Sequence, residues 1–224
     1  QVGQGDDDTL RGVIRLTAPA PFGRKHVAPA IADFSRRHPQ VGFDLRLTDR
    51  MVDLYDDGFD LAIRLDEPTD SRLLSTPLAL NRGMLVASPS YLAAHGTPHR
   101  PEDLSRHHAL LPAGPDGTQN TWTMRQGRRE RTVEINGALG SDSGEILHAW
   151  CLAGLGISLR ETWDIHDALR SGRLVPVLPD WTVPVTHISA VRARRDPVPR
   201  RLDTFIEFLA RRWRDAPWNT DGAR

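Results

Sequence analysis

The segment from Gly12 to Leu47 constrains the fold most, because it reads in order as strand, turn, helix and strand. Residues 13–17 are mostly apolar or β-branched, as in a buried strand. Pro19 and Pro21 end that strand, because proline has no N–H to donate to a neighbouring strand. This order predicts a right-handed parallel βαβ unit of an α/β protein.

Helical spacing follows the turn, since Val27, Ile31 and Phe34 recur at i, i+4 and i+7. The helix must end before Pro39, and the apolar odd positions of residues 41–47 predict the second strand. The other face of that strand carries charged side chains. We therefore expect it to face solvent or a partner.

The rest of the chain continues to alternate strands and helices. Residues 122–124 and 132–135 flank a polar turn, which predicts a β-hairpin rather than a crossover. A helix that begins near Ser143 is expected to bury one apolar side, formed by Ile146, Leu147, Trp150, Cys151 and Leu155. A closing amphipathic helix aligns Leu202, Phe205, Ile206, Leu209 and Trp213. Further strands are expected at 61–65, 80–87, 157–159, 174–178 and 187–192.

Two of these strands, 80–87 and 187–192, enclose a long segment with a βα pattern of its own. If both strands are crossovers, the chain forms two lobes, and a cleft between them is a natural small-molecule site. Lobe I is expected to comprise 12–84 plus 190–216 and lobe II, inserted into it, 85–189, with a residual linker at 1–11 and a tail at 217–224.

Composition excludes several function classes. The chain has 29 basic and 29 acidic residues, so no net charge draws it to DNA or to an anionic membrane. Cys151 is the only cysteine, which excludes an internal disulfide and favours the cytoplasm. No apolar run reaches the roughly 20 residues of a membrane span. The chain begins with Gln1 rather than methionine, which indicates either a processed mature protein or a fragment.

Five segments, in this order, resemble one known family: GVIRLTAPAPFGRKHVAPAIADFSRRHP, GFDLAIRL, MLVASPSYLAAHG, CLAGLGISL and SGRLVPVLPDW. They are similar to the effector-binding domain of LysR-type bacterial transcriptional regulators, from Gly12 to Trp213. The resemblance implies the periplasmic-binding-protein type 2 fold, with two Rossmann-like lobes joined by two crossover strands. It also implies a homodimer, with a tetramer as the alternative for the whole regulator, and a winged helix-turn-helix that this chain lacks.

In this family the effector is held between the lobes. We transfer the family's contact positions to this sequence and add polar residues near strand ends. The expected effector contacts are then Pro21, Phe22, Thr48, Asp49, Arg50, Arg64, Ser88, Ser141, Asp142, Ser143, Gly144 and Arg160. Many relatives have serine or threonine where this chain has Pro21. Ser143, Thr48, Arg50 or Arg160 would then replace that hydroxyl, and arginine can pair bidentately with a carboxylate. We expect a small anionic effector, a carboxylate, and no cofactor or metal.

Each of these residues also has a purely structural interpretation. The segment 141–144 can cap a helix without touching a ligand, and the arginines can form ordinary salt bridges. Trp163 can close over a ligand or lie in the core. Cys151 can sense oxidants or simply pack in the core, and the position on an apolar helix side favours packing. The histidines at 95, 99, 107 and 108 leave a metal site as a minor alternative.

Two other functions compete with the regulator hypothesis. A periplasmic solute-binding protein of the same fold would explain the missing methionine through removal of a signal peptide. A hydrolase would need a nucleophile motif, and neither such a motif nor a glycine-rich phosphate loop is present in the sequence. We therefore expect a sensor rather than an enzyme.

Overall fold

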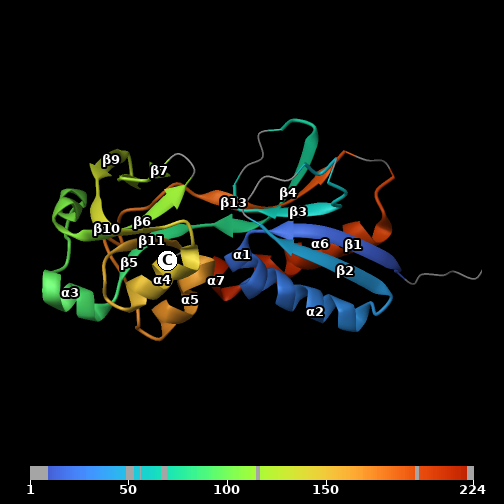
Figure 1. Cartoon of the computed structure of the whole chain (residues 1–224), viewed down its shortest axis with the longest axis horizontal. Coiled ribbons are helices and arrows are strands. Elements are labelled where there is room, and N and C mark those ends of the chain that lie inside the picture. The colour runs from blue at the N-terminus through green and yellow to red at the C-terminus, as the bar shows by residue number, and fades with distance from the viewer. Residues whose placement is uncertain are drawn as a thin grey trace, which may run out of the picture. The chain divides into compact units, whose positions relative to one another are not determined.

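The computed structural model describes residues 10–48, 53–55, 57–66, 70–114, 117–194 and 197–220. The chain divides into two compact units (Figure 1). Unit 1 comprises Gln1–Leu80 and His187–Ala216, and unit 2 comprises Asn81–Thr186 and Pro217–Arg224. The unit boundaries thus lie at 80/81 and 186/187, a few residues before the expected 84/85 and 189/190.

The segment expected as a tail, 217–224, is described as far as Thr220 and forms helix α7 (Pro217–Thr220). It groups with unit 2 because Trp218 is buried and because Arg82 donates a hydrogen bond to the Asn219 carbonyl at 3.3 Å. The described part of this segment is therefore packed rather than free.

Unit 1 is built on a five-stranded sheet with the order β2-β1-β3-β13-β4. The strands are β1 (Gly12–Ala18), β2 (Val41–Leu47), β3 (Leu61–Arg64), β4 (Leu73–Asn81) and β13 (Thr186–Ala193). β1 and β2 pair in parallel along their whole length, from Gly12 opposite Val41 to Ala18 opposite Leu47, which confirms the predicted βαβ unit. β13 runs antiparallel to β3.

The helical segment between β1 and β2 has three parts: α1 (Ala20–Phe22), a π-helical turn η1 (Gly23–Val27) and α2 (Ala28–Arg37). A Cβ on Gly23 would collide with Cδ2 of Leu47, so a larger residue there would have to displace that side chain. Pro29 lacks an N–H for the preceding turn, which favours a local widening of the helix. The sequence pattern predicted the helix but not this turn.

An aromatic cluster joins α2 to the closing helix α6 (Arg200–Arg214). The Phe34 ring packs 5.1 Å from that of Phe205 and 5.3 Å from that of Phe208. Trp213 meets Phe22 edge to face at 5.1 Å. The predicted apolar face of α6 is buried, which confirms that face and fixes the helix in unit 1.

The strands of unit 2 form two groups, one with β10 next to β6 and one in the order β11-β5-β12. These strands are β5 (Gly83–Ala87), β6 (His108–Gly114), β10 (Asn136–Ser141), β11 (Ser158–Glu161) and β12 (Val175–Pro176). β6 and β10 are parallel, and β5 pairs antiparallel with both β11 and β12. A parallel bridge between Ala109 and Ile157 links the two groups. The smaller elements are α3 (Pro89–His95), the 3-10 helix η2 (Pro101–Arg106) and β7 (Gly117–Thr118).

The two faces of the β11-β5-β12 sheet are covered differently. Val86 packs with residues of α4 (Gly144–Leu152) and α5 (Thr162–Arg170), which Figure 1 shows side by side. Its neighbours Leu85 and Ala87 point to the other face. They pack there against the hairpin β8 (Thr121–Gln126) and β9 (Arg129–Glu134). The predicted hairpin is confirmed.

Two local predictions were wrong. The single strand expected at 80–87 is two strands, β4 and β5, that end and begin on either side of Arg82. On α4, Leu147 and Cys151 are buried, but Ile146 and Leu155 were expected to be buried and are 43% and 44% exposed. An apolar pattern alone does not tell a core side chain from an exposed one.

No helix among the described residues is both long and apolar enough to cross a membrane.

Candidate functional site

In unit 2, the predicted contacts 141–144 lie where β10 ends and α4 begins. Ser143 occupies the N-cap position of α4, but its side chain makes no capping hydrogen bond, and its backbone N–H donates to Ser141 Oγ at 3.0 Å. Asp142 is exposed. The first N–H groups of a helix have no partner within the helix and carry a positive partial charge, so this end of α4 is suited to bind an anion.

Arg160 on β11 lies against the same helix end. A Cβ built on Gly144 would lie 2.8 Å from Nη2 and 3.3 Å from Nη1 of Arg160, so glycine leaves the space that the guanidinium occupies. The Arg160 side chain is only 6% exposed. The structure therefore places Arg160 next to Gly144 at the end of the 141–144 segment.

Arg160 is held by a buried carboxylate. Its Nε and Nη2 donate to Oδ2 of Asp164 at 3.1 Å and 2.8 Å, and His148 Nδ1 lies 3.0 Å from the same oxygen. Burial acts to raise the pKa of Asp164, but the hydrogen bond from His148 and the charge of Arg160 outweigh it and hold that pKa below the ordinary value. Asp164 thus stays ionised and fixes the guanidinium at the helix end.

Unit 1 has a cavity of its own at the carboxyl ends of its parallel strands. It has a volume of about 230 Å³ and is lined by Thr17, Pro19, Thr48, Ile63, Arg64, Leu65 and Asp66. Thr48 and Arg64 were predicted contacts, and this cavity brings them together. Arg64 Nε and Nη2 donate to the two carboxylate oxygens of Asp66, each at 2.9 Å. Any ligand carboxylate would compete with Asp66, which is 65% exposed, for this guanidinium.

Three other predicted contacts lie elsewhere. Phe22 is fully buried and packs on Trp213, so it shapes the site without surface of its own. Pro21 is half-buried in α1. Ser88 caps α3 by accepting the Tyr91 N–H at 3.2 Å, at the opposite end of the unit 2 sheet from Arg160, so the structure does not bring it to the others. Asp49 and Arg50 lie outside the described residues.

The structure also bears on the other candidate residues. The Trp163 indole donates to Asn81 Oδ1 at 3.1 Å and its side chain is buried, as in the core interpretation. Burial raises the pKa of the Cys151 thiol to about 12, so that it stays protonated and unreactive at neutral pH. Within the described residues, no three His, Cys, Asp or Glu side chains are grouped to hold a metal ion.

Sequence reasoning missed His148 and Asp164. Arg160 and Asp164 are four residues apart, but the chain changes from strand to helix between them, so no periodic pattern pairs them. His148 reaches the pair from α4. The only available signal was a charged residue on the otherwise apolar start of α5.

Comparison with known proteins decides the family. Residues 7–214 match the LysR substrate binding domain. The chain belongs to this family. It is 38% identical over 201 residues to the HTH-type transcriptional activator TtdR of Escherichia coli K12, and 36% identical over 199 residues to the transcriptional regulator DmlR of the same organism. Each alignment covers 89% of this chain and 64% of the relative, so the chain spans less than two thirds of the length of these LysR-type regulators.

Solved structures of LysR-type regulators have the same fold as this chain. The regulatory domain of CrgA from Neisseria meningitidis matches with a TM-score of 0.80 at 30% identity, over 90% of this chain and 98% of that one. Full-length AphB of Vibrio cholerae matches with a TM-score of 0.78 at 26% identity, over 90% of this chain and 68% of that one. This effector-binding domain therefore has the periplasmic-binding-protein type 2 fold of LysR regulatory domains. Its relatives are named as transcriptional regulators, not as enzymes.

Proposed function

We propose that this LysR-type effector-binding domain senses a small carboxylate and relays its binding to a DNA-binding domain outside the chain. One observation carries the proposal: the uncapped N-terminus of α4, with Gly144 against the buried guanidinium of Arg160. Helix N–H groups and a fixed guanidinium together favour a planar anion. Asp164 holds the Arg160 guanidinium at the helix end through two hydrogen bonds, so the N–H groups and the positioned guanidinium would act together on the anion.

Unit 1 would supply the remaining contacts. Thr48 offers a hydroxyl, and Arg64 can exchange Asp66 for a ligand carboxylate. An effector that engages both units would favour one arrangement of the regulator over another, by no more than its difference in affinity for the two arrangements. We take Thr48, Arg64, Ser143, Gly144 and Arg160 as the central contacts.

The proposal includes self-association. Leu47 on β2 is 37% exposed, and Ile146 and Leu155 in and after α4 are more exposed still. These side chains are the exposed apolar surface of β2 and of the α4 region that a second copy would cover. We propose a homodimer in which β2 of one copy meets α4 of the other, with a tetramer in the whole regulator. The domain would act in the cytoplasm and without catalysis.

A thermal-shift screen tests the sensing function. A carboxylate at about 100 times its dissociation constant should add about 2.7 kcal/mol, which raises Tm by roughly 5 to 10 °C for a chain of this size. We expect a rise with carboxylic acids and none with sugars. Ser143→Ala should reduce the rise, whereas Ser105→Ala, an exposed serine on η2, should not. A rise with sugars alone would contradict the proposal.

A further inference from the structure

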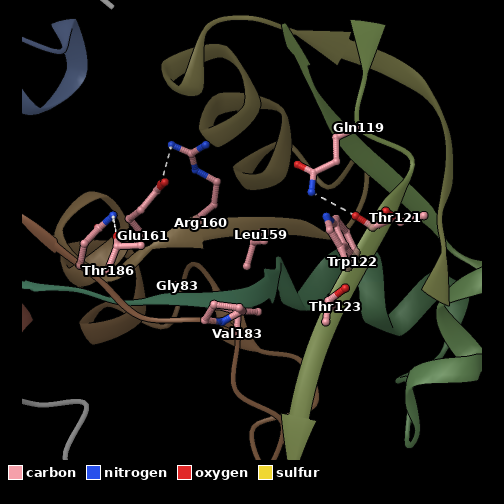
Figure 2. Close-up of a pocket in the computed structure, with 12 residues that line it drawn as sticks. Gly83, Gln119, Thr121, Trp122, Thr123, Leu159, Arg160, Glu161, Val183 and Thr186 are labelled. Atoms are coloured by element: carbon pink, nitrogen blue, oxygen red, sulfur yellow. Dashed lines mark hydrogen bonds and ion pairs between the residues drawn. The ribbon is translucent and has the colours of Figure 1, made fainter. Parts of the chain in front are cut away.

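A second cavity lies entirely within unit 2, on the hairpin side of its sheet (Figure 2). It has a volume of about 340 Å³. The start of β8 forms one wall, β11 with the start of β5 forms another, and the segment 183–186 forms the third. None of the residues 141–144 lines it, but Arg160 borders both this cavity and the proposed anion site.

Pro184 prevents the 183–186 segment from pairing with β8. Arg125 and Thr182 form an antiparallel bridge with both backbone hydrogen bonds, at 2.7 Å and 2.8 Å. Continued pairing would place Thr123 opposite residue 184, which is Pro184 and has no N–H to donate. The 183–186 segment therefore diverges from β8, and the space between them is the cavity.

A buried donor without a partner faces this space. Trp122 is 1% exposed, and its Nε1 has no hydrogen-bond acceptor. Figure 2 shows that nitrogen on the side where Gln119 lies, whose Nε2 donates to the Thr121 carbonyl at 3.1 Å. Trp163, by contrast, satisfies its indole N–H with Asn81. Because buried N–H groups are nearly always paired, the Trp122 N–H indicates an acceptor supplied from outside the chain.

The charged side chains that line the cavity favour a neutral acceptor over an anion. Arg160 is already bound to Asp164, and the carboxylate of Glu161 lies 3.8 Å from its Nη2. Because Glu161 also lines the cavity, its negative charge disfavours an added anion there. Leu159 and Val183 supply apolar surface beside the donor.

We propose that this cavity binds a small neutral molecule with a carbonyl oxygen, such as an amide or a lactone, on an apolar body. The carbonyl accepts the Trp122 N–H after the exposed Gln119 side chain swings aside, and the apolar body packs on Leu159 and Val183. This would be a second input to the domain, in addition to the carboxylate of the proposed function, and Arg160 borders both sites.

NMR of the indole N–H groups tests the proposal. The chain has six tryptophans, and the signal that Trp122→Phe removes belongs to Trp122. Acetanilide and δ-valerolactone, both neutral, should shift this signal, whereas benzoate should not. The affinity for acetanilide can be measured by its competition with a fluorine-labelled probe. Acetanilide should bind Trp122→Phe about tenfold more weakly than the wild type, because one buried hydrogen bond is lost.

A second pair of variants leaves the buried core intact. Val183→Phe fills the cavity from a half-buried loop position and should abolish acetanilide binding. Val185→Phe, in the same segment but 51% exposed and outside the lining, should leave binding unchanged. If no neutral probe shifts the Trp122 signal at millimolar concentration, or if Val183→Phe binds as well as the wild type, the proposal is wrong.

Discussion

Gly144 and Arg160 occupy each other's space: a Cβ on Gly144 would lie 2.8 Å from Nη2 of Arg160. The guanidinium cannot retreat easily, because it is buried and donates twice to Asp164. The absence of a side chain at the first residue of α4 thus places a fixed positive group beside the helix N-terminus. This contact is the structural basis of the proposed carboxylate site.

Gly144→Ala should disturb this contact. The added methyl group must displace the Arg160 guanidinium, which should lower the free energy of unfolding by about 1 to 2 kcal/mol and weaken carboxylate binding. Urea unfolding and calorimetric titration measure the two effects. Gly140→Ala in neighbouring β10 is the control, because a Cβ there meets no atom closer than 3.4 Å. Equal behaviour of the two variants would contradict the role of this contact.

Asp164→Asn should remove the buried counter-charge of Arg160 and leave only the more distant Glu161 carboxylate, 3.8 Å from Nη2. Breaking a buried pair costs about 3 kcal/mol, and we expect a loss of this size in urea unfolding at neutral pH. The exposed Asp167→Asn on the same helix should cost far less.

The loss caused by Asp164→Asn should depend on pH in a defined direction. The folded-state pKa of Asp164 is lowered, so its stabilisation is fully present above the ordinary carboxyl pKa and disappears as pH falls through the lower folded-state value. The difference between wild type and Asp164→Asn should stay constant from neutral pH to about pH 5 and shrink only below about pH 4. A difference that already shrinks between pH 7 and 5 would contradict this.

His107 should make the domain less stable in mild acid. Burial lowers its pKa, the charges of His95 and His108 lower it further, and Asp103 opposes them. Protonation therefore favours the unfolded state, and stability should fall as pH drops through about 6.5. His107→Gln should flatten this dependence in thermal unfolding, whereas the exposed His99→Gln should not. An unchanged slope in His107→Gln would refute the assignment.

Tyr91 lies beside this histidine. Its hydroxyl lies 3.2 Å from His107 Nδ1 and accepts the His108 backbone N–H at 2.9 Å. Burial raises the pKa of Tyr91, so the hydroxyl stays protonated and able to donate to a neutral His107. Tyr91→Phe should therefore destabilise the domain near neutral pH, where His107 needs that donor.

Self-association should depend on the exposed apolar side chains of β2 and α4. Leu47→Asp and Ile146→Asp should each shift sedimentation equilibrium towards the monomer, because each places a charge in the proposed dimer contact. Val185→Asp changes an equally exposed valine outside both elements and should leave the dimer intact. A wild-type monomer at high protein concentration would refute the dimer.

The sequence predicts those parts of the fold that depend on local periodicity. The parallel pairing of β1 with β2, the hairpin β8–β9 and the buried face of α6 follow from alternation, turn residues and helical spacing. The contact between Gly23 in the π-helical turn and the distant Leu47 side chain does not follow from these patterns. Local pattern cannot reveal a contact that forms only after the strands pair.

Some residues of the candidate site could likewise be predicted from local sequence pattern, whereas others could not. Ser143 and Gly144 could be named as candidates because they lie at the start of a predicted helix, and Thr48 because it follows a predicted strand. The Asp164 and His148 partners of Arg160 could not be found, because strand, helix and a second helix bring them together. Ile146 was taken as core because exposure depends on which face of α4 meets the sheet.

Amide NMR during titration with the best carboxylate of the thermal screen tests the central claim most directly. The account predicts that Thr48 in unit 1 and Ser143 and Gly144 in unit 2 shift together with a single Kd. Asp164→Asn should raise that Kd about tenfold, since Arg160 is then no longer held at the helix end. Shifts confined to residues away from both segments, or an unchanged Kd in Asp164→Asn, would contradict the account.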